Sequence, residues 1–503
     1  MKRFFSLAFS LLMLLPLGAC VPAEQPGSTS APEVSAPGDT SVQLPVNVPF
    51  ALPIYTEQSM HPVLTSNRAN LTLAPLLYEP LFQVNEAFEA EPVLCSGWSV
   101  SEDKLTWIFT LQAGVTFSDG TPLTGAAVAD ALTLACGKDS RYSSRLACVA
   151  RITGTEDSVT VVLHQPRGNL PLLLDIPIAL GKGDVPLGTG PYVLRDEGGA
   201  PVLAARSDWW QSSHLPAEEL LLQPVETGDD LIFSFDSGSI ALVDVDLMGT
   251  NALGFSGSYE TWDYATTDMI YLGFNTREKT LFENPALRQA LAKAVDRDTV
   301  TRTVFSGHAV PASLPIHPDS PGWDRALASV WDYDPQPLVA AVSELKESRR
   351  TLTFLVNSEN SAKVSTAEFI AYQLESVGLT VTLQILPFED YSAALKAGNY
   401  DLYLGEVVLT ADFDLSALLT PTGTLNYGGW ANEETDVLLA RAASASAGEP
   451  ADLHALLSHL EEQVPFTPIC FKNGSVLTRW GRLSGLSPLR GNVFYRLENW
   501  IME

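Results

Sequence analysis

Alternating apolar and polar residues predict a strand over residues 105–111. The apolar residues at every second position are Leu105, Trp107, Phe109 and Leu111. In an extended segment this spacing places all four on one face, as in a half-buried strand. A turn sequence follows at 118–120, and a helix is predicted over 124–135.

A second pattern predicts a helix over residues 284–297. Asn284 can cap its first turn, and Pro285 stands at the first helical position, where a missing N–H costs nothing. One apolar stripe then recurs with the period of a helix. Its members are Leu287, Ala290, Leu291, Ala294 and Val295.

The segment from 352 to 385 has the pattern of a β-α-β unit. An apolar run at 352–356 is followed by a helical pattern in which Ser365 and Glu368 form a capping box. Gly378 ends the helix, and apolar residues alternate again over 379–385. In parallel sheets built from such units, solute sites lie beyond the carboxyl ends of the strands.

The first twenty residues have the pattern of an export signal. Lys2 and Arg3 precede a short apolar run, which is too short to span a bilayer and ends in small residues before Cys20. This ending resembles the lipobox of bacterial lipoproteins, in which Cys20 receives the lipid. A Pro/Ser/Ala/Gly-rich stretch at 21–45 suits a flexible tether. The alternative is an ordinary signal peptide and a soluble, secreted protein.

Composition narrows the class of protein. The 503 residues are enough for two or three packed lobes. Acidic residues outnumber basic ones 59 to 30, for a formal charge of -29, which argues against nucleic acid as a partner. The acidic balance suits a cationic or zwitterionic ligand, or simply a soluble surface.

Four cysteines remain after Cys20. Cys136 and Cys148 are close enough in sequence to form a disulfide, and burial of all four as separate thiols is the alternative. Because no C-x-x-C pair occurs, metal and redox cofactors have no support. The four are Cys95, Cys136, Cys148 and Cys470.

Ordered motifs along most of the chain resemble the family 5 extracellular solute-binding proteins. They begin with Leu-Tyr-Glu-Pro-Leu and continue with a Phe-Ser-Asp-Gly-Thr-Pro-Leu-Thr segment, Gly-Thr-Gly-Pro-Tyr, Tyr-Leu-Gly-Phe-Asn-Thr and Asn-Tyr-Gly-Gly-Trp. These motifs lie at 77–81, 117–124, 188–192, 271–276 and 426–430.

The resemblance implies an α/β, two-lobed periplasmic-binding-protein-like fold of type II. Two strands would join the lobes, and a subdomain would be inserted in the first lobe. The expected boundaries are 45–75, 186–268 and 478–503 for the first lobe, 76–185 for the inserted subdomain and 269–477 for the second lobe.

The same resemblance implies a lipid-anchored, extracytoplasmic protein that is not an enzyme and carries no cofactor. It would capture peptides or similar small solutes as a monomer and deliver them to an ABC permease and ATPase complex. A nickel or metal-chelate carrier and a peptide-signal sensor are the alternatives within this family.

Three residues match ligand-binding positions of the peptide-binding relatives. Asp412 follows Ala411 as in the family's Ala-Asp-Tyr segment and would pair with a ligand ammonium; a solvated loop acid or a helix cap is the alternative. Asp414 resembles the second aspartate of that segment and also suits a helix cap. Tyr271 would line the cleft or pack at the hinge. A tryptophan usual in relatives is Leu409 here, which puts ligand identity in doubt.

The sequence lacks the sets of residues that an enzyme or a metal carrier would need. Ser101 and Lys104 fit the S-x-x-K spacing of penicillin-binding enzymes, but no K-T-G or S-D-N accompanies them. The seven histidines form no cluster. His454 and His459 share a predicted helix at a spacing that does not align them for a metal.

Overall fold

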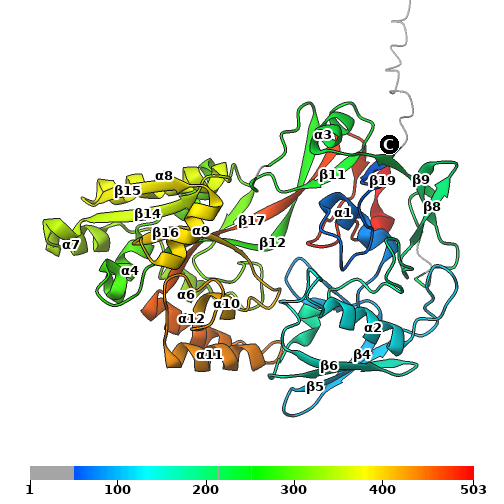
Figure 1. Cartoon of the computed structure of the whole chain (residues 1–503), viewed down its shortest axis with the longest axis horizontal. Coiled ribbons are helices and arrows are strands. Elements are labelled where there is room, and N and C mark those ends of the chain that lie inside the picture. Colours follow the sequence, from blue (N-terminus) through cyan, green and yellow to red (C-terminus); the bar gives the residue numbers. More distant parts are fainter. Residues whose placement is uncertain (1–49, 212–213, 251, 503) are drawn as a thin grey trace, which may run out of the picture. The chain divides into compact units, whose positions relative to one another are not determined.

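The structure, a computed structural model, describes residues 50–211, 214–250 and 252–502. The predicted export signal, Cys20 and the tether at 21–45 lie outside these residues. Helices and strands alternate along the described chain, so the protein is α/β (Figure 1). No helix among the described residues has the length and apolar character needed to cross a bilayer.

One part of the described chain, which we call the β1 unit after its first strand, is built on a four-stranded sheet with the order β1-β10-β9-β8. Helix α1 packs against this sheet and begins after Asn67, whose side chain accepts a hydrogen bond from the backbone N–H of Asn70. A capping box of Thr227 and Asp230 starts helix α3. The elements are β1 (Ala51–Ile54), α1 (Arg68–Leu77), β8 (Tyr192–Glu197), β9 (Ala200–Ala205), β10 (Glu219–Pro224), α3 (Gly228–Asp236), β18 (Leu483–Ser484), η4 (Leu497–Asn499) and β19 (Ile501–Met502).

The β5 unit has its own four-stranded sheet, in the order β4-β5-β7-β6, and its own apolar core. The predicted strand is β5, in which Trp107 and Phe109 are buried while Ile108 is exposed. The predicted helix is α2, capped by Thr124. The elements are β2 (Phe82–Val84), β3 (Ala90–Pro92), β4 (Cys95–Val100), β5 (Thr106–Leu111), α2 (Gly125–Ala135), β6 (Val149–Gly154), β7 (Ser158–Leu163) and η1 (Leu170–Leu173).

The β14 unit contains a seven-stranded sheet in the order β11-β17-β12-β16-β14-β15, with β13 paired to β17. Helices α8 and α9 lie against β14 and β15 (Figure 1). Its strands are β11 (Leu242–Val245), β12 (Tyr259–Phe274), β13 (Ala309–Pro311), β14 (Thr351–Asn357), β15 (Thr380–Leu386), β16 (Leu402–Val408) and β17 (Phe466–Arg479). Its helices are η2 (Leu281–Glu283), α4 (Pro285–Lys293), α5 (Arg297–Thr303), α6 (Arg325–Ser329), α7 (Gln336–Glu344), η3 (Glu347–Arg349), α8 (Ser361–Ser376), α9 (Phe388–Ala397), α10 (Ser416–Leu419), α11 (Glu433–Ser444) and α12 (Ala451–Gln463).

The predicted β-α-β unit is confirmed, but the start of its helix is wrong. Strands β14 and β15 pair in parallel, and Gly378 after the helix has a φ of 96°, in the left-handed region. Helix α8 begins at Ser361 rather than at Ser365, because Asn360 accepts a hydrogen bond from the N–H of Lys363 at 3.0 Å. Ser365 therefore lies inside the helix and caps nothing.

The predicted helix over 284–297 is two helices. Helix α4 starts as expected, with Asn284 accepting a hydrogen bond from the N–H of Ala286, and its apolar stripe is buried. It ends at Lys293, and Asp296 caps the next helix, α5, by accepting from the N–H of Thr299 at 2.9 Å. An aspartate that can cap a new helix competes with continuation of the old one.

Two long strands connect the core of the β1 unit to the core of the β14 unit. Strands β12 and β17 pair antiparallel along nearly their whole length, from Tyr259 opposite Arg479 to Gly273 opposite Phe466. At one end β17 contributes Val476 to the core of the β1 unit, and farther along both strands enter the core of the β14 unit. Any relative movement of these units must therefore bend or twist this strand pair.

Candidate functional site

The two aspartates expected to meet a ligand are both paired with one arginine. Arg167 Nη1 lies 3.2 Å from Asp412 Oδ2, and Arg167 Nη2 lies 2.6 Å from Asp414 Oδ2. The aspartates lie in the turn between β16 and α10 of the β14 unit, whereas Arg167 lies between β7 and η1 of the β5 unit. This Arg167 triad therefore joins the β5 unit to the β14 unit by a charged contact.

Other groups occupy the second oxygen of each carboxylate. Asp412 Oδ1 accepts a hydrogen bond from the hydroxyl of Thr410. Asp414 Oδ1 accepts at 2.8 Å from the N–H of Ser416, the first residue of helix α10, whose N-cap position is Leu415. Side-chain exposures of 15% for Arg167, 16% for Asp412 and 19% for Asp414 place the triad away from bulk water. Asp412 is not a solvated loop acid.

Burial and charge act in opposite directions on the two carboxylates. Burial raises the pKa of Asp412 above its ordinary value, and Arg167 offsets part of that rise. Burial also acts to raise the pKa of Asp414, but Arg167 and the hydrogen bonds from Ser416 outweigh it, so this pKa is lowered. Asp414 is thus the more firmly ionised partner.

Two strained phenylalanines adjoin the triad. Phe413, between the two aspartates, has a φ of 54°, and Phe88, in the β2–β3 hairpin, has a φ of 57°. Bulky residues rarely adopt this left-handed conformation, which persists where surrounding contacts hold it and is frequent at functional sites. The two rings lie 5.2 Å apart, and Phe88 is buried in the core of the β14 unit.

Lys104 makes a second contact between the same two units. Its Nζ donates to the carbonyl of Ser444 at 2.7 Å and to the hydroxyl of Ser446 at 2.9 Å. The hydroxyl of Ser101 donates instead to Asp103. The ammonium expected to activate a serine in an S-x-x-K enzyme therefore serves to hold two parts of the fold together.

Tyr271 follows the packing alternative. Its side chain is 2% exposed and lies in the core of the β14 unit. Its ring meets Tyr403 and Phe466 edge to face, at 5.8 and 5.5 Å. Burial raises the pKa of its hydroxyl. In this structure the residue supports the sheet that carries β16 and the aspartate turn.

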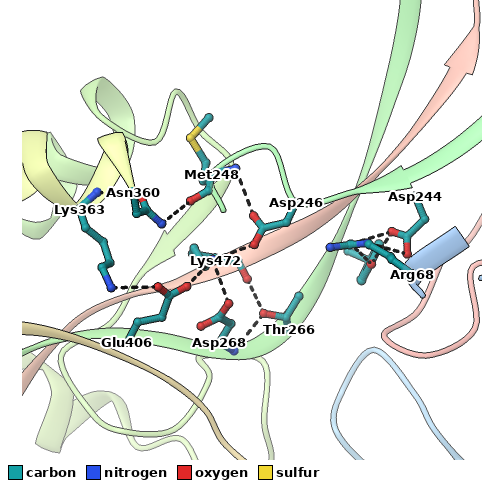
Figure 2. Close-up of polar contacts among 11 residues, drawn as sticks. Arg68, Asp244, Asp246, Met248, Thr266, Asp268, Asn360, Lys363, Glu406 and Lys472 are labelled. Carbon is teal, nitrogen blue, oxygen red and sulfur yellow. Dashed lines mark hydrogen bonds and ion pairs between the residues drawn. The ribbon is translucent and has the colours of Figure 1, made fainter. Parts of the chain in front are cut away.

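A buried lysine on the long strand pair gathers three carboxylates (Figure 2). Lys472 Nζ on β17 lies 2.8 Å from Asp246, 3.0 Å from Asp268 and 2.6 Å from Glu406. Lys363 of helix α8 lies 3.2 Å from the other oxygen of Glu406. We call these five residues the lysine cluster; it links the end of β11 to β12, β16, β17 and α8.

The lysine cluster contains one carboxylate more than its lysines neutralise. Burial acts to lower the pKa of Lys472, but the three carboxylates outweigh it and raise this pKa. Burial raises the pKa of Asp268 to about 7, against the attraction of Lys472. Asp268 Oδ1 is buried and accepts no hydrogen bond from the described residues. Protonation of Asp268 would bring the cluster to a net charge of zero.

The raised pKa of Asp268 predicts a pH dependence of stability. The unfolded carboxyl releases its proton near the ordinary value of 3.8, whereas the folded one holds it up to about 7. Folding stability from this group therefore falls as the pH rises from about 4 to about 7. Asp268→Asn should remove that fall, so its stability relative to the wild type should be higher at pH 8 than at pH 5. Urea midpoints at both pH values measure this difference.

Asp332, which is exposed, provides the matched control. Asp332→Asn should shift the urea midpoint by the same small amount at pH 5 and pH 8. A difference between Asp268→Asn and wild type that does not change with pH would contradict the raised pKa.

A cavity of about 190 Å³ lies beside the β2–β3 hairpin and the strand pair. Its wall carries three acidic residues and one arginine, and Phe88 connects it to the ring of Phe413. The charged residues are Glu86, Asp263, Asp319 and Arg490. Larger cavities, of about 890 and 720 Å³, lie between α4 and α7 and beside Trp209 and Trp210. The cavity of about 720 Å³ also carries charged residues, including Arg490, but the smaller cavity is the stronger candidate because it adjoins the strand pair at Asp263 and Tyr264.

The remaining predicted groups lie apart from this site. Cys136 and Cys148 are free thiols, which follows the alternative of separate cysteines. His454 and His459 both lie on α12, but His459 contacts Thr435 while His454 contacts the carbonyl of Gly322. Among the described residues, no three His, Cys, Asp or Glu side chains are arranged to hold a metal ion.

Sequence reasoning missed Arg167 and Lys472. Nothing local distinguishes Arg167, which lies in a polar turn. Lys472 does carry a signal, because it interrupts an apolar strand after Ile469, Cys470 and Phe471. A lysine at such a position is rarely buried without a partner, so it predicts acidic residues on neighbouring strands.

Comparison with known proteins agrees with this architecture. The family model of the bacterial extracellular solute-binding proteins, family 5 (middle), matches residues 89–428. The glutathione-binding protein GsiB of Salmonella paratyphi A is 26% identical over 416 residues, which cover 76% of this chain and 80% of GsiB.

Solved structures show the same fold. The ABC transporter substrate-binding protein CtaP of Listeria monocytogenes superimposes with a TM-score of 0.74 at 19% identity, covering 90% of this chain and 99% of CtaP. The periplasmic murein tripeptide-binding protein MppA, in its unliganded open form, gives a TM-score of 0.74 at 19% identity, with 90% and 97% covered.

The fold is that of the two-lobed periplasmic binding proteins. The chain belongs to the family 5 bacterial extracellular solute-binding proteins, as its motifs suggest. Members of this family bind solutes outside the cytoplasm and work with ABC permeases, and they are not enzymes.

Proposed function

We propose that this protein captures short peptides with a free N-terminal ammonium group and delivers them to an ABC permease and ATPase complex. It works as a monomer held at the outer face of the membrane by a lipid on Cys20. The first lobe comprises 45–75, 186–268 and 478–503, with a subdomain inserted at 76–185, and the second lobe comprises 269–477. Asp412 and Asp414 contact the solute.

The observation that carries this proposal is the concentration of carboxylates around one small cavity. Glu86, Asp263 and Asp319 line it, and Phe88 connects it to the turn that holds Asp412 and Asp414. All three residues are exposed, and their carboxylates can form charge-assisted hydrogen bonds with an ammonium group. The names of two relatives, which bind glutathione and murein tripeptide, support solutes of this size and type.

Arg490 adds a positive charge to the cavity wall, and its Nη2 already pairs with Asp175 Oδ2 at 3.2 Å. It lines the same cavity, and its Nε is buried with no hydrogen-bond partner among the described residues. A guanidinium is the side chain best suited to bind a carboxylate. A zwitterionic solute would thus find groups of both signs in one wall. The cavity of about 190 Å³ is smaller than most ligand pockets, so a peptide requires the units to move apart.

A thermal-shift screen tests the proposed solute class. Short peptides, sugars and nickel chelates are added separately to the mature protein without residues 1–20. A solute that binds the folded state at 100 times its Kd stabilises it by about 2.7 kcal/mol, so a class of short peptides should raise the melting temperature. A shift produced by sugars or nickel chelates alone would contradict the peptide assignment.

A further inference from the structure

The carboxylates proposed to receive the solute already hold a cation that belongs to the protein. Arg167 contacts one oxygen of Asp412 and one of Asp414, while Thr410 and Ser416 occupy the others. The guanidinium spans two acids with two separate nitrogens, a fork geometry that an ammonium group cannot reproduce. A solute ammonium can approach these acids only by sharing or displacing Arg167.

We propose that Arg167 is a specificity-determining residue that competes with the cationic group of the solute for Asp412 and Asp414. This inference rests on the proposed function. With Arg167 in place, the triad has a net charge of −1 instead of −2, so its attraction for a second cation is weaker. Solutes with a single weak cationic contact are then rejected, and those that also make contacts outside the triad are retained.

The position of Arg167 gives the competition a second consequence. The arginine comes from the β5 unit and the acids from the β14 unit, so the ion pairs also bind the two units together. A solute that displaces Arg167 would replace a contact within the protein by its own. Binding of the solute to the two aspartates and release of Arg167 from them are therefore the same exchange of one cation for another.

Calorimetry with trialanine and N-acetyl-trialanine tests the competition. Arg167→Ala should bind trialanine at least about tenfold more tightly than the wild type, because a charged competitor is gone. The acetylated peptide, which has no ammonium, should bind both proteins equally. Arg167→Lys, which keeps the charge but loses the fork geometry, should bind trialanine with an affinity between those of wild type and Arg167→Ala.

Arg151→Ala is the matched control. It removes one positive charge from an exposed position of the same β5 unit, on strand β6, and should leave trialanine affinity unchanged. Equal affinity of Arg167→Ala and wild type for trialanine would overturn the inference. Weaker binding by Arg167→Ala would also overturn it, because Arg167 would then be a partner of the solute carboxylate.

A second measurement does not depend on peptide binding. Ethylguanidinium at millimolar concentration can refill the space left in Arg167→Ala, and it should raise the melting temperature of this variant more than that of wild type or Arg151→Ala. If trialanine binds no variant but this selective rescue is seen, the peptide assignment fails and the role of Arg167 stands. Equal effects of ethylguanidinium on all three proteins would overturn the inference.

Discussion

Lys472→Met should lower the free energy of unfolding by about 3–5 kcal/mol, because it leaves three carboxylates around a buried position with one lysine fewer. Lys472 is 2% exposed and lies within 3.0 Å of Asp246, Asp268 and Glu406. After the change, Lys363 still neutralises Glu406, but Asp246 and Asp268 lose their cation. The midpoint of urea unfolding at pH 8 measures the loss.

Two variants separate this effect from a general loss of lysine. Lys396→Met removes an exposed lysine at the end of helix α9 and should change stability by less than about 0.5 kcal/mol. The double variant Lys472→Met/Asp268→Asn should recover part of the stability, because it removes one uncompensated buried charge. If Lys472→Met is no less stable than Lys396→Met, the lysine cluster does not hold the strand pair.

Asp412→Ala should weaken binding of a peptide with a free N-terminus by about 1.5–3 kcal/mol, the contribution typical of a hydrogen bond to a charged group. Arg167 still pairs with Asp414 in this variant, so the contact between the units is kept. Isothermal titration with a peptide selected by the thermal-shift screen measures the affinity. The N-acetylated form of that peptide should bind the variant and the wild type equally.

Asp332→Ala is the control for Asp412→Ala. Asp332 is exposed and lies outside the triad and the lysine cluster, so its removal changes net charge without touching the site. Its peptide affinity should match that of the wild type. Unchanged affinity in Asp412→Ala as well would remove Asp412 from the solute site.

Local signals predicted the elements that local chemistry determines. The cap at Asn284, the alternation in β5 and the left-handed stop at Gly378 each depend on residues a few positions apart. The predicted start of α8 was wrong because a contact distant in sequence also holds Asn360 in place. Its side-chain amide donates to the carbonyl of Met248. A capping box at Ser365 is chemically reasonable but loses to this better-connected cap.

The site depends on contacts that no local pattern contains. Arg167 and Asp412 are 245 positions apart, and Lys472 reaches Asp246 across 226. Family resemblance pointed to Asp412 and Asp414, but it could not show that the protein supplies a cation for both. The same resemblance suggested a cleft position for Tyr271, which the packing of Tyr403 and Phe466 encloses in a core.

Apolar side chains of the β5 unit are shared with the core of its neighbour. Val84, Phe88 and Leu172 are 3%, 4% and 6% exposed, and all three belong to the core of the β14 unit. Parting the two units would wet these side chains, at a cost of about 1.5–3 kcal/mol for each one fully exposed. Salt screens ion pairs but does not weaken this apolar contact between the two units. Raising the ionic strength alone should therefore not separate the β5 and β14 units when no solute is bound.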